Sequence, residues 1–198
     1  MNNVTPPRRL ILASTSKYRK MLLERLALSF DCESPKTDES AGINEAPADL
    51  VSRLATQKAL VVANHNPSAI VIGSDQLAVF EEQIVGKPGD HELALQQLMS
   101  FSGQKINFLT AVTVFCREIG FYEQYTDSTQ VCFRVLQQDE VERYLLQEKP
   151  YDCAGAFKAE GLGIVLFESI ESNDPTALIG LPLIQTAAML RKAGLSVP

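Results

Sequence analysis

Three hydroxyl residues follow directly on the first apolar run of the chain. The run Leu10–Ala13 has the composition of a buried strand, and Ser14–Ser16 lead from it into a helical repeat of apolar residues near Met21. The first N–H groups of a helix lack partners within it and carry partial positive charge, so this turn can bind an anion. Arg19 adds a guanidinium suited to phosphate oxygens. A plain helix cap followed by a solvated arginine explains the same residues equally well.

A lysine interrupts the apolar stripe of the clearest predicted helix. Residues 47–64 carry Val51, Leu54 and Val62 on one face, and Lys58 continues that face at helical spacing. A lysine that faces a core or cleft must find an anion or extend past the core to water. Extension to water is the more common outcome, but a bound phosphate would suit this position better.

An aspartate stands in the most apolar predicted strand. The run from Ala69 to Phe80 is typical of a buried strand, and we expect its small and polar residues, among them Asp75, at its carboxyl end. Ligands of open α/β sheets bind beyond that end of the strands. Asp75 is therefore the best-placed carboxylate of the chain, although an aspartate that caps a turn would give the same pattern.

Two stretches rich in helix breakers carry further charges. Residues 35–42 have the composition of a loop and contain Asp38 and Glu39 side by side, an acidic pair that is most often merely solvated. Lys87 lies between Gly86 and Pro88, which restrict the backbone around it. These charges can form a binding site only if the fold brings them together.

Further strand and helix patterns follow along the chain. Residues 106–117 and 121–135 are predicted to form two long strands of a hairpin, residues 164–167 a short strand, and the residues after Pro182 the last helix. A length of 198 residues with 45% hydrophobic content suits one domain or two small lobes around a core.

Composition excludes several classes of protein. The net charge of −6 and the lack of a basic run argue against binding a long nucleic acid. Four scattered cysteines and two distant histidines favour neither a zinc cluster nor a disulfide framework. No apolar run is long enough for a membrane span, and the first nine residues lack the apolar core of a signal peptide, so we expect a cytoplasmic protein without a membrane partner.

Taken together, these segments resemble the Maf family of nucleotide pyrophosphatases, from about Leu10 to about Lys192. The motifs that carry the resemblance are, in order, Ala13-Ser14-Thr15-Ser16 with Arg19, Thr37-Asp38-Glu39, Lys58, Ser74-Asp75-Gln76, Gly86-Lys87-Pro88, Ser102-Gly103, Ala154-Gly155-Ala156 and Gly180-Leu181-Pro182. The resemblance implies one Maf-like domain over residues 1–198, with an α/β fold, a long mixed β-sheet flanked by helices and two lobes around a central cleft, as in inosine triphosphate pyrophosphatases.

The resemblance also implies an activity and roles for individual residues. The family hydrolyses nucleoside triphosphates between the α and β phosphates, releasing pyrophosphate, with a divalent metal such as Mg²⁺ or Mn²⁺. Matched by motif, the phosphate-binding positions are Ser14, Ser16, Arg19, Lys58 and Lys87, the proton acceptor is Asp75, and the metal-associated carboxylates are Glu39 and Asp75. The family further suggests a homodimer. The rival hypothesis is a nucleotide-binding regulator of cell division without turnover.

Three positions separate branches of the family, and here they hold Tyr18, Gln76 and Glu160. The thymidine and uridine triphosphate branch has arginine, threonine and glutamine there, so this chain resembles the YceF-type branch, whose substrate is 7-methylguanosine triphosphate. A tyrosine face attracts the positively charged base, a glutamate can accept its N1–H and amino group, and Gln76 could contact a polar base edge. The alternatives are the dTTP/UTP type, or packing for Tyr18 and solvation for Glu160.

One position departs from some relatives. They carry a lysine where this chain has Cys153, between Asp152 and Ala154. We assign Cys153 no catalytic role, because no nearby group is expected to lower its pKa.

Overall fold

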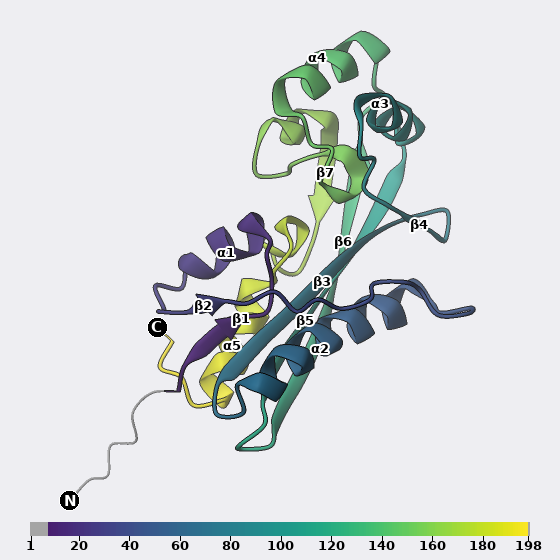
Figure 1. The fold of residues 1–198 in the computed structure, drawn as a ribbon. Coiled ribbons are helices and arrows are strands. Elements are labelled where there is room, and N and C mark those ends of the chain that lie inside the picture. Colours follow the sequence, from purple (N-terminus) through teal and green to yellow (C-terminus); the bar gives the residue numbers. More distant parts are fainter. Residues whose placement is uncertain (1–7, 198) are drawn as a thin grey trace, which may run out of the picture.

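The computed structural model describes residues 8–197, and within this range the strands form one seven-stranded sheet (Figure 1). The sheet order is β2-β1-β3-β5-β6-β7, with β4 paired to β3. The strands are β1 (Leu10–Leu12), β2 (Asp31–Cys32), β3 (Ile70–Phe80), β4 (Gln83–Val85), β5 (Lys105–Cys116), β6 (Phe121–Phe133) and β7 (Phe167–Glu171). The α-helices are α1 (Lys17–Glu24), α2 (Pro47–His65), α3 (His91–Ser100), α4 (Gln138–Glu148) and α5 (Leu183–Lys192).

The sheet is mixed, as the resemblance to the Maf family implies. Strand β1 runs parallel to β2 and β3, whereas β3, β5, β6 and β7 pair antiparallel in turn. The β5–β6 hairpin is the longest pairing, from Lys105 opposite Cys132 to Cys116 opposite Phe121. The α/β fold with a long mixed sheet flanked by helices is confirmed.

Alternating residues of β1 and the alanine that follows it build two apolar layers on opposite faces of the sheet. Leu10 and Leu12 pack with residues of α1 and α5, while Ile11 and Ala13 pack with α2. The predicted inner face of α2 is confirmed, since Val51, Leu54 and Val62 are all buried. We call these two layers together the first core.

A second core lies at the other end of the sheet, where α3 and α4 cover the far halves of the long strands (Figure 1). It is rich in aromatic side chains, and Phe133, Phe157 and Phe167 meet with ring centroids 4.8 to 5.7 Å apart. Strand β3 runs from one core to the other, with Ile70 and Ile72 in the first and Ala78 in the second. The residues between them therefore lie where the two cores adjoin.

Three predictions of the sequence need correction. Asp75 lies in the middle of β3 and not at its carboxyl end, because the strand continues through Phe80 into the second core. Residues 164–167 are not a strand: a 3₁₀ helix covers Leu162–Leu166, and β7 begins only at Phe167. Short apolar runs fit a strand or a buried helix equally well, so periodicity could not separate the two. Met21 is exposed, and Leu22 and Leu23 carry the inner face of α1.

Among residues 8–197, no helix is both long and apolar enough to cross a membrane.

Candidate functional site

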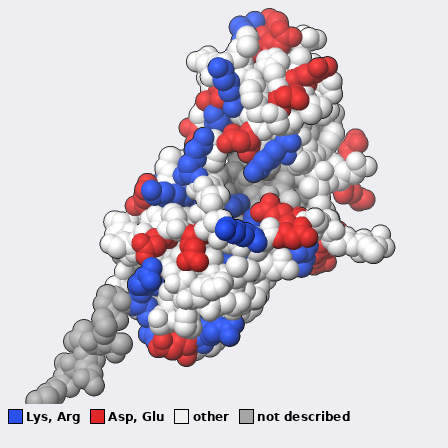
Figure 2. Space-filling view, in the orientation of Figure 1, with Lys and Arg blue, Asp and Glu red and all other residues white. Residues whose placement is uncertain are grey.

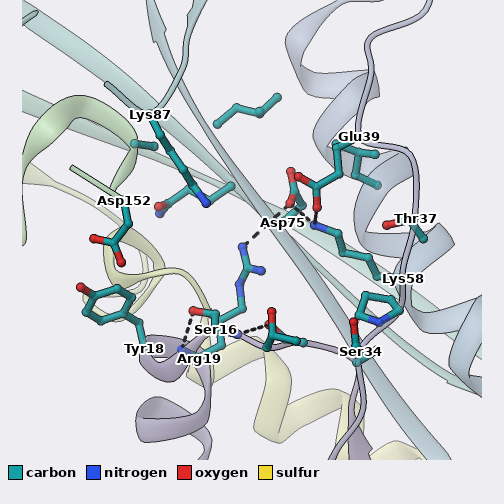
Figure 3. A pocket seen from close by; sticks show the side chains of 18 of the residues that line it. Ser16, Tyr18, Arg19, Ser34, Thr37, Glu39, Lys58, Asp75, Lys87 and Asp152 are labelled. Carbon is teal, nitrogen blue, oxygen red and sulfur yellow. Dashed lines mark hydrogen bonds and ion pairs between the residues drawn. The ribbon is translucent and has the colours of Figure 1, made fainter. Parts of the chain in front are cut away.

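A cavity of about 750 Å³ lies between the two cores. Figure 2 shows basic and acidic side chains gathered around a hollow in this part of the molecule, and Figure 3 shows the cavity from close by. The structure brings together all the residues expected to bind phosphate or metal or to take a proton; those lining this cavity are Ser14, Ser16, Arg19, Glu39, Lys58, Asp75 and Lys87. They come from the β1–α1 junction, the loop before α2, α2, β3 and the segment after β4.

The β1–α1 junction forms one wall through its hydroxyl groups. Ser16 caps α1, and its Oγ accepts from the backbone N–H of Arg19 at 3.4 Å. Ser14 Oγ in turn accepts from the N–H of Ser16 at 3.1 Å. The remaining N–H groups of the first turn have no partner within the helix, and both Lys17 and Tyr18 line the cavity. The structure therefore contains the predicted turn, with its hydroxyls and backbone N–H groups beside the cavity.

The guanidinium of Arg19 is hydrogen-bonded through its Nε, and its other end lies near the carboxylate of Asp75. Its Nε donates to the carbonyl oxygen of Gly180 at 3.0 Å, and its Nη2 lies 3.9 Å from Asp75 Oδ1. Burial lowers the pKa of Arg19, and the charges of Asp75 and Glu39 partly oppose that shift. A guanidinium remains charged under these conditions, so a fixed positive charge faces the cavity.

Lys58 joins the two carboxylates of the site. Its Nζ lies 2.6 Å from Asp75 Oδ1 and 2.5 Å from Glu39 Oε1, as the dashed lines in Figure 3 show. The lysine side chain is only 6% exposed, so the extension to water considered above does not occur. The need for an anion is met by protein carboxylates, and an anionic ligand would share this lysine with them.

A glycine permits this contact. A Cβ atom on Gly73 would lie 2.2 Å from the carbonyl oxygen of Ala55 and 2.6 Å from the backbone nitrogen of Ala59. Both neighbours belong to α2, so only a residue without a side chain lets the helix approach β3 this closely. The close approach carries Lys58 to within hydrogen-bonding distance of Asp75, two residues after the glycine.

The loop before α2 presents Glu39, whose side chain is 61% exposed. Partial burial raises the pKa of Glu39, but the hydrogen bond and charge of Lys58, with the charges of Lys87 and Arg19, hold it below its usual value. Glu39 is therefore ionised at neutral pH. The surrounding cations make it a carboxylate that faces the cavity and not a merely solvated loop acid.

An arginine that sequence reasoning missed fixes this loop. Arg53 of α2 donates to both carboxylate oxygens of Glu45, at 2.6 and 2.7 Å, and to the carbonyl oxygen of Ser40 at 3.0 Å. The loop is thus tied to α2 at the residue that directly follows Glu39. Opposite charges eight positions apart were the only hint in the sequence, and they cannot show that a loop folds back between them.

A smaller cavity of about 130 Å³ adjoins the first. It shares Ser16, Tyr18, Arg19, Gln76, Lys87, Asp152 and Ala154 with the larger cavity. Glu160 lines only the smaller one, beside the apolar side chains of Phe108 and Phe157. The three positions that separate branches of the family, from α1, β3 and the loop after α4, therefore meet in one place.

Two of these three positions are more restricted than the sequence suggests. The amide nitrogen of Gln76 lies within 3.0 Å of Thr110 Oγ1 and of the carbonyl oxygens of Ala177 and Leu178, so it is not free to donate to a ligand. The ammonium of Lys17 lies 4.9 Å from the centroid of the Tyr18 ring and occupies one of its faces. A base that stacks on Tyr18 must use the opposite face.

Cys153 also lines the smaller cavity, and its Sγ lies 3.7 Å from the Tyr18 hydroxyl. Burial raises the pKa of this thiol to about 11. The prediction that nothing near Cys153 lowers its pKa is wrong in detail, since the hydrogen bond with Tyr18 and the charge of Lys158 both lower it, but burial outweighs them and the net shift is upward. A protonated thiol is a poor nucleophile, so this cysteine contributes to the shape of the cavity.

The carboxylates of the larger cavity supply only part of the ligands that a hard divalent cation needs. Glu39 and Asp75 approach the same ammonium group, so their oxygens converge on one point. No group of three or more His, Cys, Asp or Glu residues within 8–197 could hold a metal. Mg²⁺ often uses one or two protein carboxylates together with substrate phosphates. This donor set fits such a shared ion.

Comparison with known proteins gives a consistent result. A curated protein of Xanthomonas campestris pv. campestris (strain 8004) is 54% identical over 190 residues, covering 96% of this chain and 98% of that protein. Proteins of Albidiferax ferrireducens and Pseudomonas savastanoi pv. phaseolicola are each 50% identical, covering 96% of this chain and 96% and 98% of their own lengths. All three are named 7-methyl-GTP pyrophosphatase.

Among solved structures, the Staphylococcus aureus Ham1 protein aligns with a TM-score of 0.40 and 11% identity, over 64% of this chain and 72% of that one. The family model described as Maf-like protein matches residues 9–193. That match spans nearly the whole chain and contains every residue of the two cavities. This chain belongs to the Maf family.

Proposed function

We propose that this protein hydrolyses 7-methyl-GTP to 7-methyl-GMP and pyrophosphate. The observation that carries the proposal is the adjacency of two cavities of different chemistry. One is lined by cations and carboxylates, and the other, which shares Tyr18 and Gln76 with it, adds Glu160 and apolar side chains. The relatives at about 50% identity carry the name of this activity, and we expect it in the cytoplasm, where nucleotides are made.

The larger cavity suits the triphosphate. A nucleoside triphosphate carries about four negative charges, and positioning with electrostatic stabilisation dominates phosphoryl chemistry. The hydroxyls of Ser14 and Ser16, the guanidinium of Arg19 and the ammonium of Lys87 all line this space. These groups would hold the phosphates and offset the charge that develops on the leaving pyrophosphate.

Asp75 is the residue placed to accept a proton. In the proposed reaction a water oxygen bonds to the α-phosphorus, the bond to the bridging oxygen breaks, and pyrophosphate leaves with the electron pair while Asp75 takes the proton of the water. Lys58 fixes Asp75 Oδ1 at 2.6 Å, which keeps the carboxylate oriented. A bound Mg²⁺ or Mn²⁺ would neutralise phosphate oxygens, and Glu39 and Asp75 are the residues that would hold it.

The smaller cavity suits a methylated guanine. Methylation at N7 gives the base a positive charge, and Glu160 offers an acceptor to its N1–H and amino group. Uracil and thymine have a single N–H and would leave the carboxylate facing carbonyl oxygens. The free face of Tyr18 can stack on the cationic base, which contributes about 0.5 to 2 kcal/mol beyond simple contact.

A panel of nucleotides tests the proposal. Wild-type protein is incubated with Mn²⁺ and each of 7-methyl-GTP, GTP, dTTP and UTP, and pyrophosphate release is measured together with nucleotide binding. We expect the highest kcat/KM for 7-methyl-GTP. A preference for dTTP or UTP would refute the base assignment and leave a pyrophosphatase. Binding without pyrophosphate from any nucleotide would refute catalysis and favour a regulator of cell division.

A further inference from the structure

Glu148, the last residue of α4, binds the loop of Glu160 on both sides of that residue. Glu148 Oε2 accepts from the backbone N–H of Leu162 at 2.7 Å, and Oε1 lies 3.8 Å from Lys158 Nζ. The same ammonium donates to the carbonyl oxygen of Glu148 at 2.6 Å. The residues two positions before and two positions after Glu160 are therefore fixed by one glutamate.

The rest of the loop is closed around these contacts. The hydroxyl of Tyr144, a buried residue of α4, accepts from the backbone N–H of Lys158 at 3.1 Å. The carbonyl oxygen of Lys158 accepts from the N–H groups of Gly161 and Gly163 at 3.2 and 3.1 Å. The loop from 158 to 163 thus turns tightly and is bound to the carboxyl end of α4, a part of the molecule outside the catalytic cavity.

A glycine in the loop makes room for the glutamate. A Cβ atom on Gly161 would lie 2.2 Å from Glu148 Oε2, closer than any such contact tolerates. The glycine has no positive φ, so its backbone conformation does not require it. Its absent side chain lets the carboxylate reach the N–H of the next residue, Leu162.

From these contacts we infer that Glu148 is a positioning residue for base selectivity, acting through Glu160. Glu160 is exposed on its loop and lines the smaller cavity. The direction of its carboxylate therefore depends on how its loop is held, and Glu148 binds that loop through the backbone N–H of Leu162 on one side and the side-chain ammonium of Lys158 on the other. The inference rests on the proposed function, because it assigns Glu148 to the recognition of the guanine edge.

A double-mutant cycle tests the inference. Glu160→Gln alone should lower kcat/KM for 7-methyl-GTP by about tenfold, chiefly through KM, because base binding is lost. Glu148→Ala alone should lower it by about fivefold, with a much smaller effect on UTP. If Glu148 acts through Glu160, the double variant should be no worse than Glu160→Gln. Additive losses, or equal losses for all four nucleotides, would overturn the inference.

Two further variants provide an independent test and a control. Gly161→Ala leaves Glu148 in place but displaces its carboxylate from Leu162, so it should reproduce the selectivity of Glu148→Ala even if that variant folds poorly. Glu142→Ala is the matched control, since Glu142 is half-buried on the same helix, as Glu148 is, and accepts a hydrogen bond from the side chain of Gln138, outside the loop. An effect of Glu142→Ala equal to that of Glu148→Ala would assign the change to α4 as a whole and overturn the inference.

Hydrogen exchange separates this inference from the proposed function. The amide of Leu162 should exchange faster in Glu148→Ala and Gly161→Ala than in wild type, whichever nucleotide is preferred. An unchanged Leu162 amide would show that Glu148 does not hold the loop. A faster amide together with a wild type that does not prefer 7-methyl-GTP would instead refute the proposed function, and with it the role in selectivity.

Discussion

Lys58 Nζ and Asp75 Oδ1 lie 2.6 Å apart, and the two side chains are only 6% and 9% exposed. Removing two charges from water costs several kcal/mol, so a buried ion pair contributes little net stability by comparison with apolar residues. The pair lies in a cavity that Arg19 and Glu39 also line. In the proposed reaction it would keep the Asp75 carboxylate oriented between two cations, as a proton acceptor near phosphate requires.

Asp75→Asn should lower pyrophosphate release by at least about 10²-fold, because the amide keeps the shape of the side chain and cannot accept the proton. Stopped assays of pyrophosphate with 7-methyl-GTP and Mn²⁺ measure this. The control is Asp139→Asn, which removes an exposed carboxylate paired with Arg143 on α4 and should retain full activity. Near-normal turnover by folded Asp75→Asn would exclude Asp75 as the base.

Lys58→Met should lower the free energy of unfolding by about 3 kcal/mol, since it leaves the buried Asp75 without its short partner. Urea unfolding measures the change, and adding Asp75→Asn should recover part of the loss. Lys192→Met is the matched control: Lys192 pairs with Glu123 at 2.8 Å on the surface and should contribute less than about 1 kcal/mol. If the two lysine variants lose equal unfolding free energy, breaking the buried pair costs no more than breaking the exposed one, and the prediction is wrong.

Protonation of Glu45 should release the loop that carries Glu39. The hydrogen bond from Arg53, with that from the Gly42 N–H, lowers the pKa of Glu45 from 4.5 to about 2. Because the folded pKa is the lower one, the contact stabilises the ordered loop above pH 4.5, and this contribution is lost as the pH falls toward 2.

An NMR titration of Glu45, read together with amide exchange at Gly42, measures this release. The Gly42 amide should stay protected down to about pH 3, since most of Glu45 remains ionised there. In Arg53→Gln, Glu45 should titrate near its ordinary value and the amide should lose protection earlier. A wild-type midpoint near pH 4.5 would contradict the assignment.

Cys153 should resist alkylation at neutral pH. Burial raises its pKa to about 11, so only about 0.03% is thiolate at pH 7.5. Mass spectrometry after iodoacetamide treatment should show Cys153 reacting more slowly than the exposed Cys32, with a rate that rises about tenfold per pH unit between pH 8 and 10. A plateau below pH 9 would show that a neighbouring group stabilises the thiolate.

The sequence by itself determined the elements whose signal is local. The helical repeat of residues 47–64 and the two long strands of the hairpin depend on periodic apolar residues, and they form within a few residues of the predicted bounds. The need of Lys58 for an anion was also visible, because a charge on an apolar face must be compensated. The set of candidate site residues, which the structure places in two adjoining cavities, followed from their types, order and motifs.

Only the tertiary structure decided which groups meet. Asp75 lies in the middle of a strand because β3 passes through both cores, and no local pattern shows where one core ends. The partners of Lys58 depend on the close approach of α2 at Gly73. The hold of Glu148 on the loop of Glu160 joins residues on separate elements. Such contacts arise from packing between distant segments, and the periodicity of one segment carries no information about them.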